Sequence, residues 1–399
     1  MTLRTSTFNS YAVALANLQR RQNEMTDSQA RLTSGLRVMH ASDDPTAAAR
    51  AERARALMNR AESTQRAVDA SRNSMTLTES ALGDAGELLQ QARELVTAAG
   101  NASYSDDERA DVAKQLEEIR KQLMGVANRG DGAGGFVFSG QGSGKPPFLD
   151  RPGGVDYIGT GGAVRVASEE PLPLTLDGGR VWLSSSSGNG VFEARNLNSS
   201  NAWIDAGRVT APDQVTGATY TINFSNTGGT TTYSILKDGV ATGVSGAGYV
   251  EGQAIEIDGL AVTVSGSPAD GDSFELAPST SDLSVFDALD RVVSELKTPL
   301  RTGAQVTQTV QNGLRDLDSL SDHLASARSM TGEVLNRIDG VKSRLDDLKL
   351  FGETTRANAE DLDMVQAISD FQNQQTGYQA SLQTYSSIQR MSLFDYIKT

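Results

Sequence analysis

The two ends of the chain carry the same repeating pattern, in which apolar residues and glutamines alternate at spacings of three and four. This spacing is typical of a coiled-coil seam, where a stripe on one helix packs against another helix. The expected seam residues are Phe8, Tyr11, Leu15, Leu18, Gln22, Met25, Gln29 and Leu32 at one end, and Met364, Ile368, Phe371, Gln375, Tyr378, Leu382, Tyr385 and Gln389 at the other. Neither stripe can be buried alone, so the chain is expected to fold back and pair its two ends.

The pairing of the ends can be predicted residue by residue. The chain leaves through one terminal helix and returns through the other, so the two helices should run antiparallel. Matching the two seams brings Leu18 opposite Tyr378 and Gln22 opposite Gln375. We expect the two glutamines to form a buried amide pair that fixes the alignment, as a polar residue in a seam can.

A joint is expected after the N-terminal helix, which should cover residues 8–34. Gly35 interrupts the helical pattern, because glycine adopts backbone conformations that other residues avoid. Asp43, Asp44 and Pro45 then begin a new helix. The Asp44 carboxylate can accept hydrogen bonds from free amides of the first turn, and Pro45 suits the first helical position.

Helical spacing also covers most of the chain outside its middle. It predicts helices at 45–99, 106–126 and 285–297, and then from about 302 to the end, with a second joint at Gly352 and the polar residues after it.

The middle of the chain has a different composition. From Gly130 to about residue 280, short alternating runs rich in glycine, serine, threonine and valine predict antiparallel strands. Asp258 and Gly259 lie between two such runs and predict a two-residue hairpin turn. The expected fold is therefore mainly α with an inserted β domain: a long antiparallel coiled-coil-like helical bundle from both chain ends, plus a central antiparallel β domain.

Three domains follow from these patterns. Residues 1–42 and 355–399 should form a terminal coiled-coil assembly domain, residues 43–145 and 282–354 a helical bundle domain, and residues 146–281 an outward β domain.

Two short sequence motifs at the joint resemble those of a known family. Residues 32–38 have the form Leu-x-Ser-Gly-x-Arg-Val, and residues 42–50 have the form Ser-Asp-Asp-Pro-x-Ala-Ala-Ala-Arg. This order is similar to the signature of the bacterial flagellin superfamily. The Asp-Asp-Pro form, and the ending Ser-Leu-Phe-Asp-Tyr at 392–396, resemble the hook–filament junction proteins of that superfamily. The resemblance covers about residues 1–150 and 270–399.

The resemblance implies a structural protein of the bacterial flagellum. Proteins of this kind form a ring that adapts the hook to the filament, so the implied partners are copies of the chain itself, the hook-side junction protein, flagellin and, before secretion, an export chaperone. The resemblance also implies an extracellular location, reached through the flagellar type III export channel without a cleaved signal peptide. Alternatives are a flagellin of the filament itself, a cytoplasmic coiled-coil scaffold protein, or an enzyme whose site lies in the β insert.

The composition argues against other classes of function. A formal net charge of −14 argues against nucleic acid as a partner. No cysteine and only two histidines are present, so neither a thiolate metal site nor a histidine-based triad is expected. The glycine-rich segment before Pro146 lacks the spacing and the Ser or Thr of a phosphate-binding loop. No stretch is long and apolar enough to cross a membrane. We therefore expect neither enzymatic activity nor a cofactor.

Overall fold

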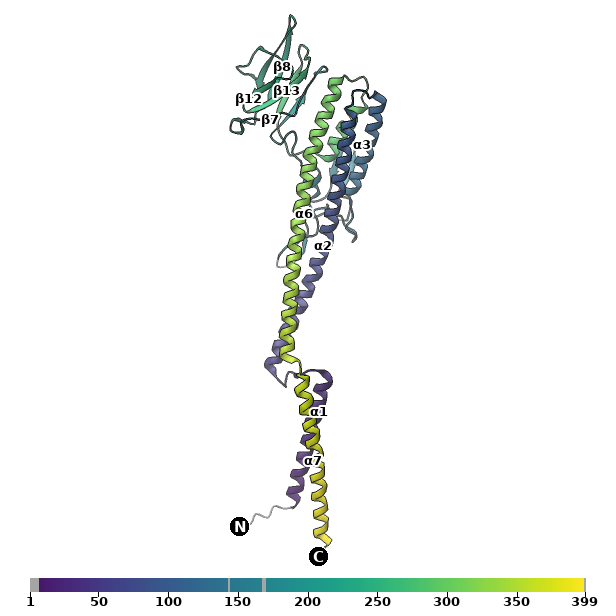
Figure 1. Ribbon diagram of the computed structural model, residues 1–399, viewed down its shortest axis with the longest axis vertical. Helices are drawn as coiled ribbons and strands as arrows, with labels where there is room; N and C mark the ends of the chain where they lie inside the picture. Colours follow the sequence, from purple (N-terminus) through teal and green to yellow (C-terminus); the bar gives the residue numbers. More distant parts are fainter. Residues whose placement is uncertain (1–6, 143, 167–169, 398–399) are drawn as a thin grey trace. The chain divides into compact units, whose positions relative to one another are not determined.

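The computed structural model describes residues 7–142, 144–166 and 170–397, and for 7–11 and 388–397 it describes only the helical backbone. Helices dominate the described chain (Figure 1). They are α1 (Thr7–Ser34), α2 (Pro45–Ala99), α3 (Asp106–Ala127), α4 (Gly178–Trp182), α5 (Val285–Lys297), α6 (Gly303–Glu360) and α7 (Met364–Ile397). A β region separates α3 from α5, which confirms the predicted fold class.

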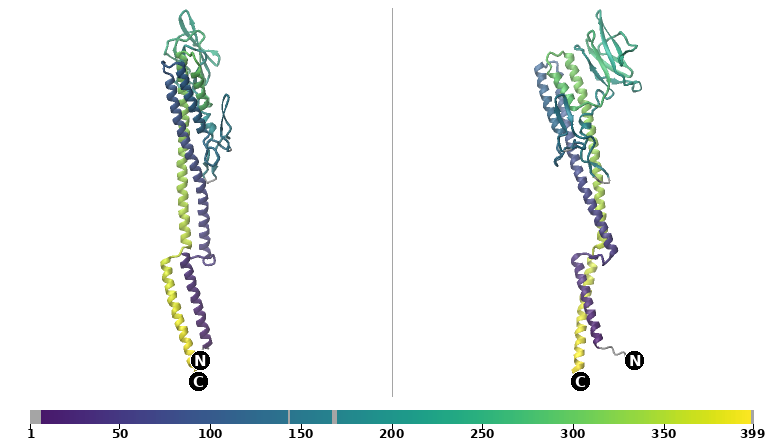
Figure 2. Two further views of the ribbon diagram at one scale, coloured as in Figure 1. Left: turned by 90° about the vertical axis from the view of Figure 1, so that its right-hand side faces the viewer. Right: turned by 180° about the vertical axis from the view of Figure 1, so that it is seen from behind.

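The chain divides into two compact units. The first comprises the described parts of Met1–Arg66 and Lys342–Thr399, and the second is Ala67–Val341. The long helices α2 and α6 contribute residues to both units. Within the first unit α1 lies beside α7, as the views in Figure 2 also show.

Capping residues explain where the shorter helices begin. Ser105 precedes α3 and forms a capping box with Glu108: the Ser105 hydroxyl accepts from the Glu108 amide at 3.3 Å, and the Glu108 carboxylate accepts from the Ser105 amide at 2.7 Å. Ser284 accepts in the same way from the amides of Phe286 and Asp287 at the start of α5. Local hydrogen bonding therefore determines these two helix starts.

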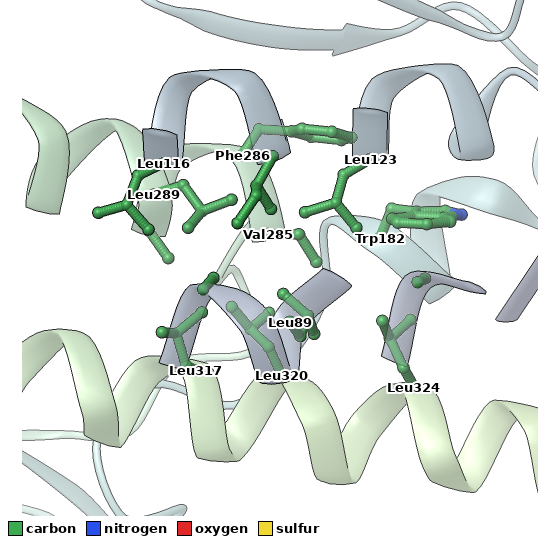
Figure 3. Close-up of a cluster of buried hydrophobic side chains, with 14 of the residues drawn as sticks. Leu89, Leu116, Leu123, Trp182, Val285, Phe286, Leu289, Leu317, Leu320 and Leu324 are labelled. Atoms are coloured by element: carbon green, nitrogen blue, oxygen red, sulfur yellow. The ribbon is translucent and has the colours of Figure 1, made fainter. Parts of the chain in front are cut away.

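The helical core of the second unit lies where α2, α3, α5 and α6 meet (Figure 3). Each helix contributes apolar residues at helical spacing. They include Leu82, Leu89, Leu116, Leu123, Phe286, Leu289, Leu317, Leu320 and Leu324. Gly313 allows α5 to approach α6 closely, because a Cβ atom there would lie 2.8 Å from a methyl group of Val292.

The strands are short and pair only in antiparallel fashion. They are β1 (Phe148–Arg151), β2 (Gly154–Tyr157), β3 (Arg165–Val166), β4 (Leu172–Pro173), β5 (Phe192–Asn196), β6 (Ala202–Ile204), β7 (Arg208–Val209), β8 (Tyr220–Thr227), β9 (Thr230–Lys237), β10 (Val240–Ala241), β11 (Ala247–Gly248), β12 (Ala254–Ile257), β13 (Leu260–Gly266) and β14 (Ser273–Pro278). Two of the sheets are larger, one in the order β10-β9-β8-β14-β5 with β11 on β9, and one in the order β12-β13-β6 with β7 on β13.

The predicted hairpin turn is present between β12 and β13. Asp258 and Gly259 both have positive φ, 41° and 78°. Positive φ at both central residues is the geometry of the two-residue turn that matches the twist of paired strands. The Asp-Gly signal in the sequence is therefore confirmed.

The β region contributes to two hydrophobic cores, and only one of them is formed by strands alone. Buried apolar residues between Phe192 and Leu276 form this core between the two larger sheets, and it is called the separate β core below. Phe148 and Trp182 instead belong to the helical core, where Trp182 stacks on Phe286 with ring centroids 6.1 Å apart. The first part of the range 146–281 thus shares its core with α2, α3, α5 and α6, because its aromatic side chains fill the space between these helices.

The second helix break lies later in the chain than we expected. Gly352 is inside α6, which continues to Glu360, and the break falls at 361–363. A Cβ atom at Gly352 would lie 2.6 Å from Cγ of Met58. Glycine at this position therefore permits close packing of α6 on α2, and it does not end the helix.

Candidate assembly site

The terminal helices α1 and α7 pack along part of the predicted seams. Leu18, Met25, Phe371 and Tyr378 are half-buried, as are Leu32 and Tyr385. All six occupy predicted seam positions. The side chains of Phe8, Tyr11 and Gln389 lie outside the described residues.

The other predicted seam residues whose side chains are described are not buried in the single chain. They are exposed: Leu15, Gln22, Gln29, Met364, Ile368, Gln375 and Leu382. Smaller or polar neighbours are half-buried in their place: Ala14, Ser28, Ala367, Gln374, Gly377 and Ser381. The expected buried amide pair of Gln22 and Gln375 is therefore wrong for the isolated chain. Gln374 instead buries its Oε1 atom, which has no hydrogen-bond partner among the described residues.

The alignment of the two helices follows from contacts at the joint. Leu36 and Asp361 form an isolated antiparallel bridge, and the Leu362 amide donates to the Gly35 carbonyl at 2.9 Å. Counting equal numbers of residues along both helices from this bridge brings Leu18 level with Tyr378, to within a residue. This agrees with the predicted antiparallel alignment of these two residues.

Close packing supports the same alignment farther along the helices. A Cβ atom at Gly377 would lie 2.6 Å from Nη1 of Arg21. The absence of a side chain at Gly377 leaves room for this guanidinium, which explains why α7 turns Gly377 and its small neighbours toward α1.

The joint between α1 and α2 has the expected turn and cap. Gly35 has a φ of +71°, a conformation that favours glycine. Oδ1 of Asp44 accepts from the amides of Thr46 and Ala47 at 3.1 and 3.0 Å, and Pro45 is the first residue of α2. These contacts confirm the sequence-based interpretation of Asp44 as a helix cap.

Asp43 and Asp44 are both held in their charged form. The amide of Ala47 and the hydroxyl of Thr46 donate to Asp44 and lower its pKa to about 2, with a further contribution from Arg37. The amides of His40 and Met39 donate to Asp43 and lower the pKa of that carboxyl as well. Hydrogen bonds to a carboxylate favour its ionised form, so both groups act as structural anions here.

Arg37, the arginine of the Leu-x-Ser-Gly-x-Arg-Val motif, connects the two joints. Arg37 bonds Asp44 at 3.4 Å, and its Nη2 donates to the Ala359 carbonyl at 2.7 Å. The Arg37 amide also donates to the Glu360 carbonyl at 2.7 Å. One residue of the first joint therefore holds both the start of α2 and the end of α6.

A buried carboxylate completes this network. The Glu360 side chain is only 5% exposed and accepts from Nη2 of Arg55 at 2.9 and 2.7 Å and from Nη1 of Arg356 at 2.7 Å. The hydrogen bond that Arg55 donates to Glu52, together with the charges of Glu360 and Glu52, raises the pKa of Arg55. No local pattern could have revealed this pairing, because Arg55 and Glu360 are 305 positions apart.

Among the described residues, no group of three or more His, Cys, Asp or Glu side chains could hold a metal ion. No described helix is long and apolar enough to cross a membrane. A hollow of about 730 Å³ in the second unit is lined by Arg93, Arg315, Asp318 and His323 among others, and its Arg93 and Asp318 side chains neutralise each other at 2.7 Å.

Comparison with protein families matches both helical ends and the β core. The model described as the bacterial flagellin N-terminal helical region matches residues 5–143, and that of the bacterial flagellin C-terminal helical region matches residues 314–397. A third model, the D2-like domain of flagellar hook-associated protein 1, matches residues 193–278, which nearly coincide with the separate β core.

Two relatives that match over nearly their whole length are both named flagellar hook-associated protein 3. Flagellar hook-associated protein 3 of Escherichia coli strain K12 is 24% identical over 408 residues, covering 99% of this chain and 100% of the relative. The protein of that name from Salmonella typhimurium strain LT2 is 25% identical and covers 98% of this chain and 99% of its own.

Solved structures extend the likeness to the fold. Hook-associated protein 3 of Legionella pneumophila superposes with a TM-score of 0.71 at 27% identity, over 76% of this chain and 97% of that one. FlgL of Xanthomonas campestris superposes with a TM-score of 0.69 at 28% identity, over 77% and 99% of the two chains.

Proposed function

Since the chain belongs to the hook-associated protein 3 group of the flagellin superfamily, as a structural component at the flagellar hook–filament junction, we propose that its terminal helix pair assembles copies of the chain into a ring there. This proposal rests on the apolar residues of α1 and α7 that stay exposed although the two helices are paired. Leu15, Ile368 and Leu382 remain exposed on paired helices, and Val365 is 82% exposed. Exposed apolar residues at seam spacing gain most by packing against further helices.

The ring has two different neighbours. On the hook side it meets the hook-side junction protein, and on the other side it meets flagellin. The chain acts mechanically and not as an enzyme, with the β core carried outward. The relatives named as hook-associated protein 3 support this role, as does the family match of both helical ends.

The protein is part of the external flagellum, and export comes before assembly. We propose that the chain leaves through the type III channel without cleavage, accompanied until then by an export chaperone. Mass spectrometry of the protein recovered from sheared flagella tests this directly. A mass equal to that of the full chain is expected, and a mass lacking an N-terminal segment would contradict export without cleavage.

Location along the flagellum is the decisive test. A labelled antibody should decorate only the distal end of the hook. A strain without the protein should lack filaments and release flagellin into the medium. Decoration along the whole filament would instead identify a flagellin, and a cytoplasmic signal with normal flagella would identify a scaffold protein.

A further inference from the structure

The first turns of α2 carry a row of arginines. Arg50, Arg53 and Arg60 are spaced so that they lie along one flank of the helix, with Leu57 between Arg53 and Arg60. All three are exposed, and in the part of the chain that the structure describes none of them forms an ion pair. Arg53 donates only to the Ala49 carbonyl of its own helix, at 3.1 Å. This row is a solvent-exposed basic surface without a counter-charge.

The end of α6, in the same compact unit, presents the opposite charge. Asp346 and Glu353 lie two helical turns apart on one flank, with Leu350 between them, and both carboxylates are exposed and without an ion-pair partner among the described residues. Lys349 is the only cation between them. Leu350 and the adjacent Phe351 are 63% and 64% exposed. The flank is therefore acidic at its ends and apolar at its centre.

The two rows overlap along the antiparallel helices. Gly352 of α6 packs against Met58 of α2 within the chain, so Leu57 of the basic row is level with Glu353 and Arg60 is level with Leu350. Two copies that meet side by side with an axial shift of about one helical turn, ~5 Å, bring Leu57 to Leu350, Arg53 to Glu353 and Arg60 to Asp346.

We propose that the arginine row on α2 of one copy docks against the acidic and apolar row on α6 of the next copy. The proposal rests on the ring assembly proposed above and assigns the faces that meet in it. Different faces on each side of a contact allow it to repeat from copy to copy and close into a ring, whereas a self-complementary face would stop at a dimer. Complementary charge also sets the choice of partner and the register.

A crosslinking experiment in the assembled flagellum tests the contact. The chain has no cysteine. Two variants, Arg60→Cys and Leu350→Cys, are expressed together in a strain lacking the native gene, and sheared flagella are treated with a short bismaleimide. Covalent dimers of one variant with the other are expected. The matched control replaces Arg60→Cys by Arg66→Cys, which lies on the opposite flank of α2 and is also exposed, and should give few dimers.

The outcomes separate this inference from the proposed function. If both variants are present at the hook tip but the Arg66→Cys pair crosslinks as well as or better than the Arg60→Cys pair, the assigned faces are wrong and the ring assembly stands. If the chain is not at the hook tip at all, the proposed function fails, and this inference fails with it.

Charge reversal adds an independent readout. Arg53→Glu, or Glu353→Arg, should lower the dimer yield about tenfold, equivalent to about 1.4 kcal/mol per contact. The two reversals in neighbouring copies should restore the yield. Neither residue has an ion pair to lose among the described residues of the isolated chain, so circular dichroism should be unchanged. A double reversal no better than either single reversal would overturn the proposal.

Discussion

Gln308 of α6 hydrogen-bonds to both backbone groups of Ile204 in β6: its Oε1 accepts from the amide at 2.8 Å, and its Nε2 donates to the carbonyl at 3.2 Å. Both residues are buried. Because β6 is an edge strand of its sheet, the amide side chain occupies the position of a neighbouring strand. The separate β core is therefore attached to α6 through directed polar contacts as well as through the chain.

Replacing Gln308 by alanine should weaken this attachment. The change leaves a buried donor and acceptor of Ile204 unpaired, which costs roughly 1–3 kcal/mol for each unpaired group. Denaturant unfolding and hydrogen exchange at the Ile204 amide measure the effect. Gln311→Ala, at an exposed position of the same helix, is the matched control and should leave both unchanged.

Arg315 of α6 also connects α6 to the separate β core, through an ion pair with Glu193 and a hydrogen bond to the Ala194 carbonyl. Its guanidinium lies 3.4 Å from Glu193 and 3.0 Å from Asp316 and donates to the Ala194 carbonyl at 3.1 Å. Burial raises the pKa of Asp316. Burial would also raise the pKa of Glu193, but hydrogen bonding from Arg195 and the charge of Arg315 lower it.

Arg315→Leu should therefore be strongly destabilising, because it leaves two buried carboxylates without their shared cation. The expected loss in the free energy of unfolding is roughly 3–5 kcal/mol. Arg291→Leu removes a cation that also contacts Asp316, at 3.2 Å, but whose side chain is 52% exposed. That variant should lose much less, and equal losses in the two variants would show that burial does not control the effect.

Glu360→Gln should loosen the joint between α6 and α7. The amide retains one acceptor but removes the negative charge that Arg55 and Arg356 share. Hydrogen bonds to charged groups contribute roughly 1.5–3 kcal/mol, and faster exchange of the Arg37 amide would report the loss. Glu52→Gln removes only the exposed partner of Arg55 and should have almost no effect.

The cap of α2 should weaken in acid. The pKa of Asp44 is lowered from 3.8 to about 2 in the folded chain. A lowered carboxyl pKa stabilises the fold fully above the unfolded value, and this contribution is lost as the pH falls through the folded value. Between pH 4 and pH 2, NMR should show the Thr46 and Ala47 amides losing protection. Asp44→Asn keeps an acceptor without a charge, so its cap should show no such pH dependence.

Deleting the separate β core should leave the helical bundle intact if the cut follows the core boundary. The Ser279 amide donates to the Val191 carbonyl at 3.0 Å, so a short Gly/Ser linker can replace Phe192–Pro278. Helical circular dichroism and the melting temperature of the bundle should persist. Removing 149–276 instead also deletes Trp182, whose loss from the helical core should lower the melting temperature. Equal behaviour of both deletions would contradict the division into two cores.

Local chemistry in the sequence by itself determined where most elements begin and turn. Caps such as Asp44 and Ser105 act within a few residues of their own position, and the Asp258-Gly259 turn needs no distant partner. The periodic stripes likewise predicted α1, α2, α6 and α7, and the antiparallel pairing of the chain ends. These features are local or repeat regularly, so the order of residues is sufficient to predict them.

Only the tertiary structure decided which flank of each stripe faces its partner. Heptad spacing allows neighbouring rows to form the seam, and the choice depends on where small residues such as Gly377 permit close approach. The same reason explains Gly352, whose role depends on Met58 far away in the sequence. The contact of Arg55 with Glu360 likewise depends on how the folded chain brings distant residues together, because neither residue's neighbours in the sequence indicate its partner.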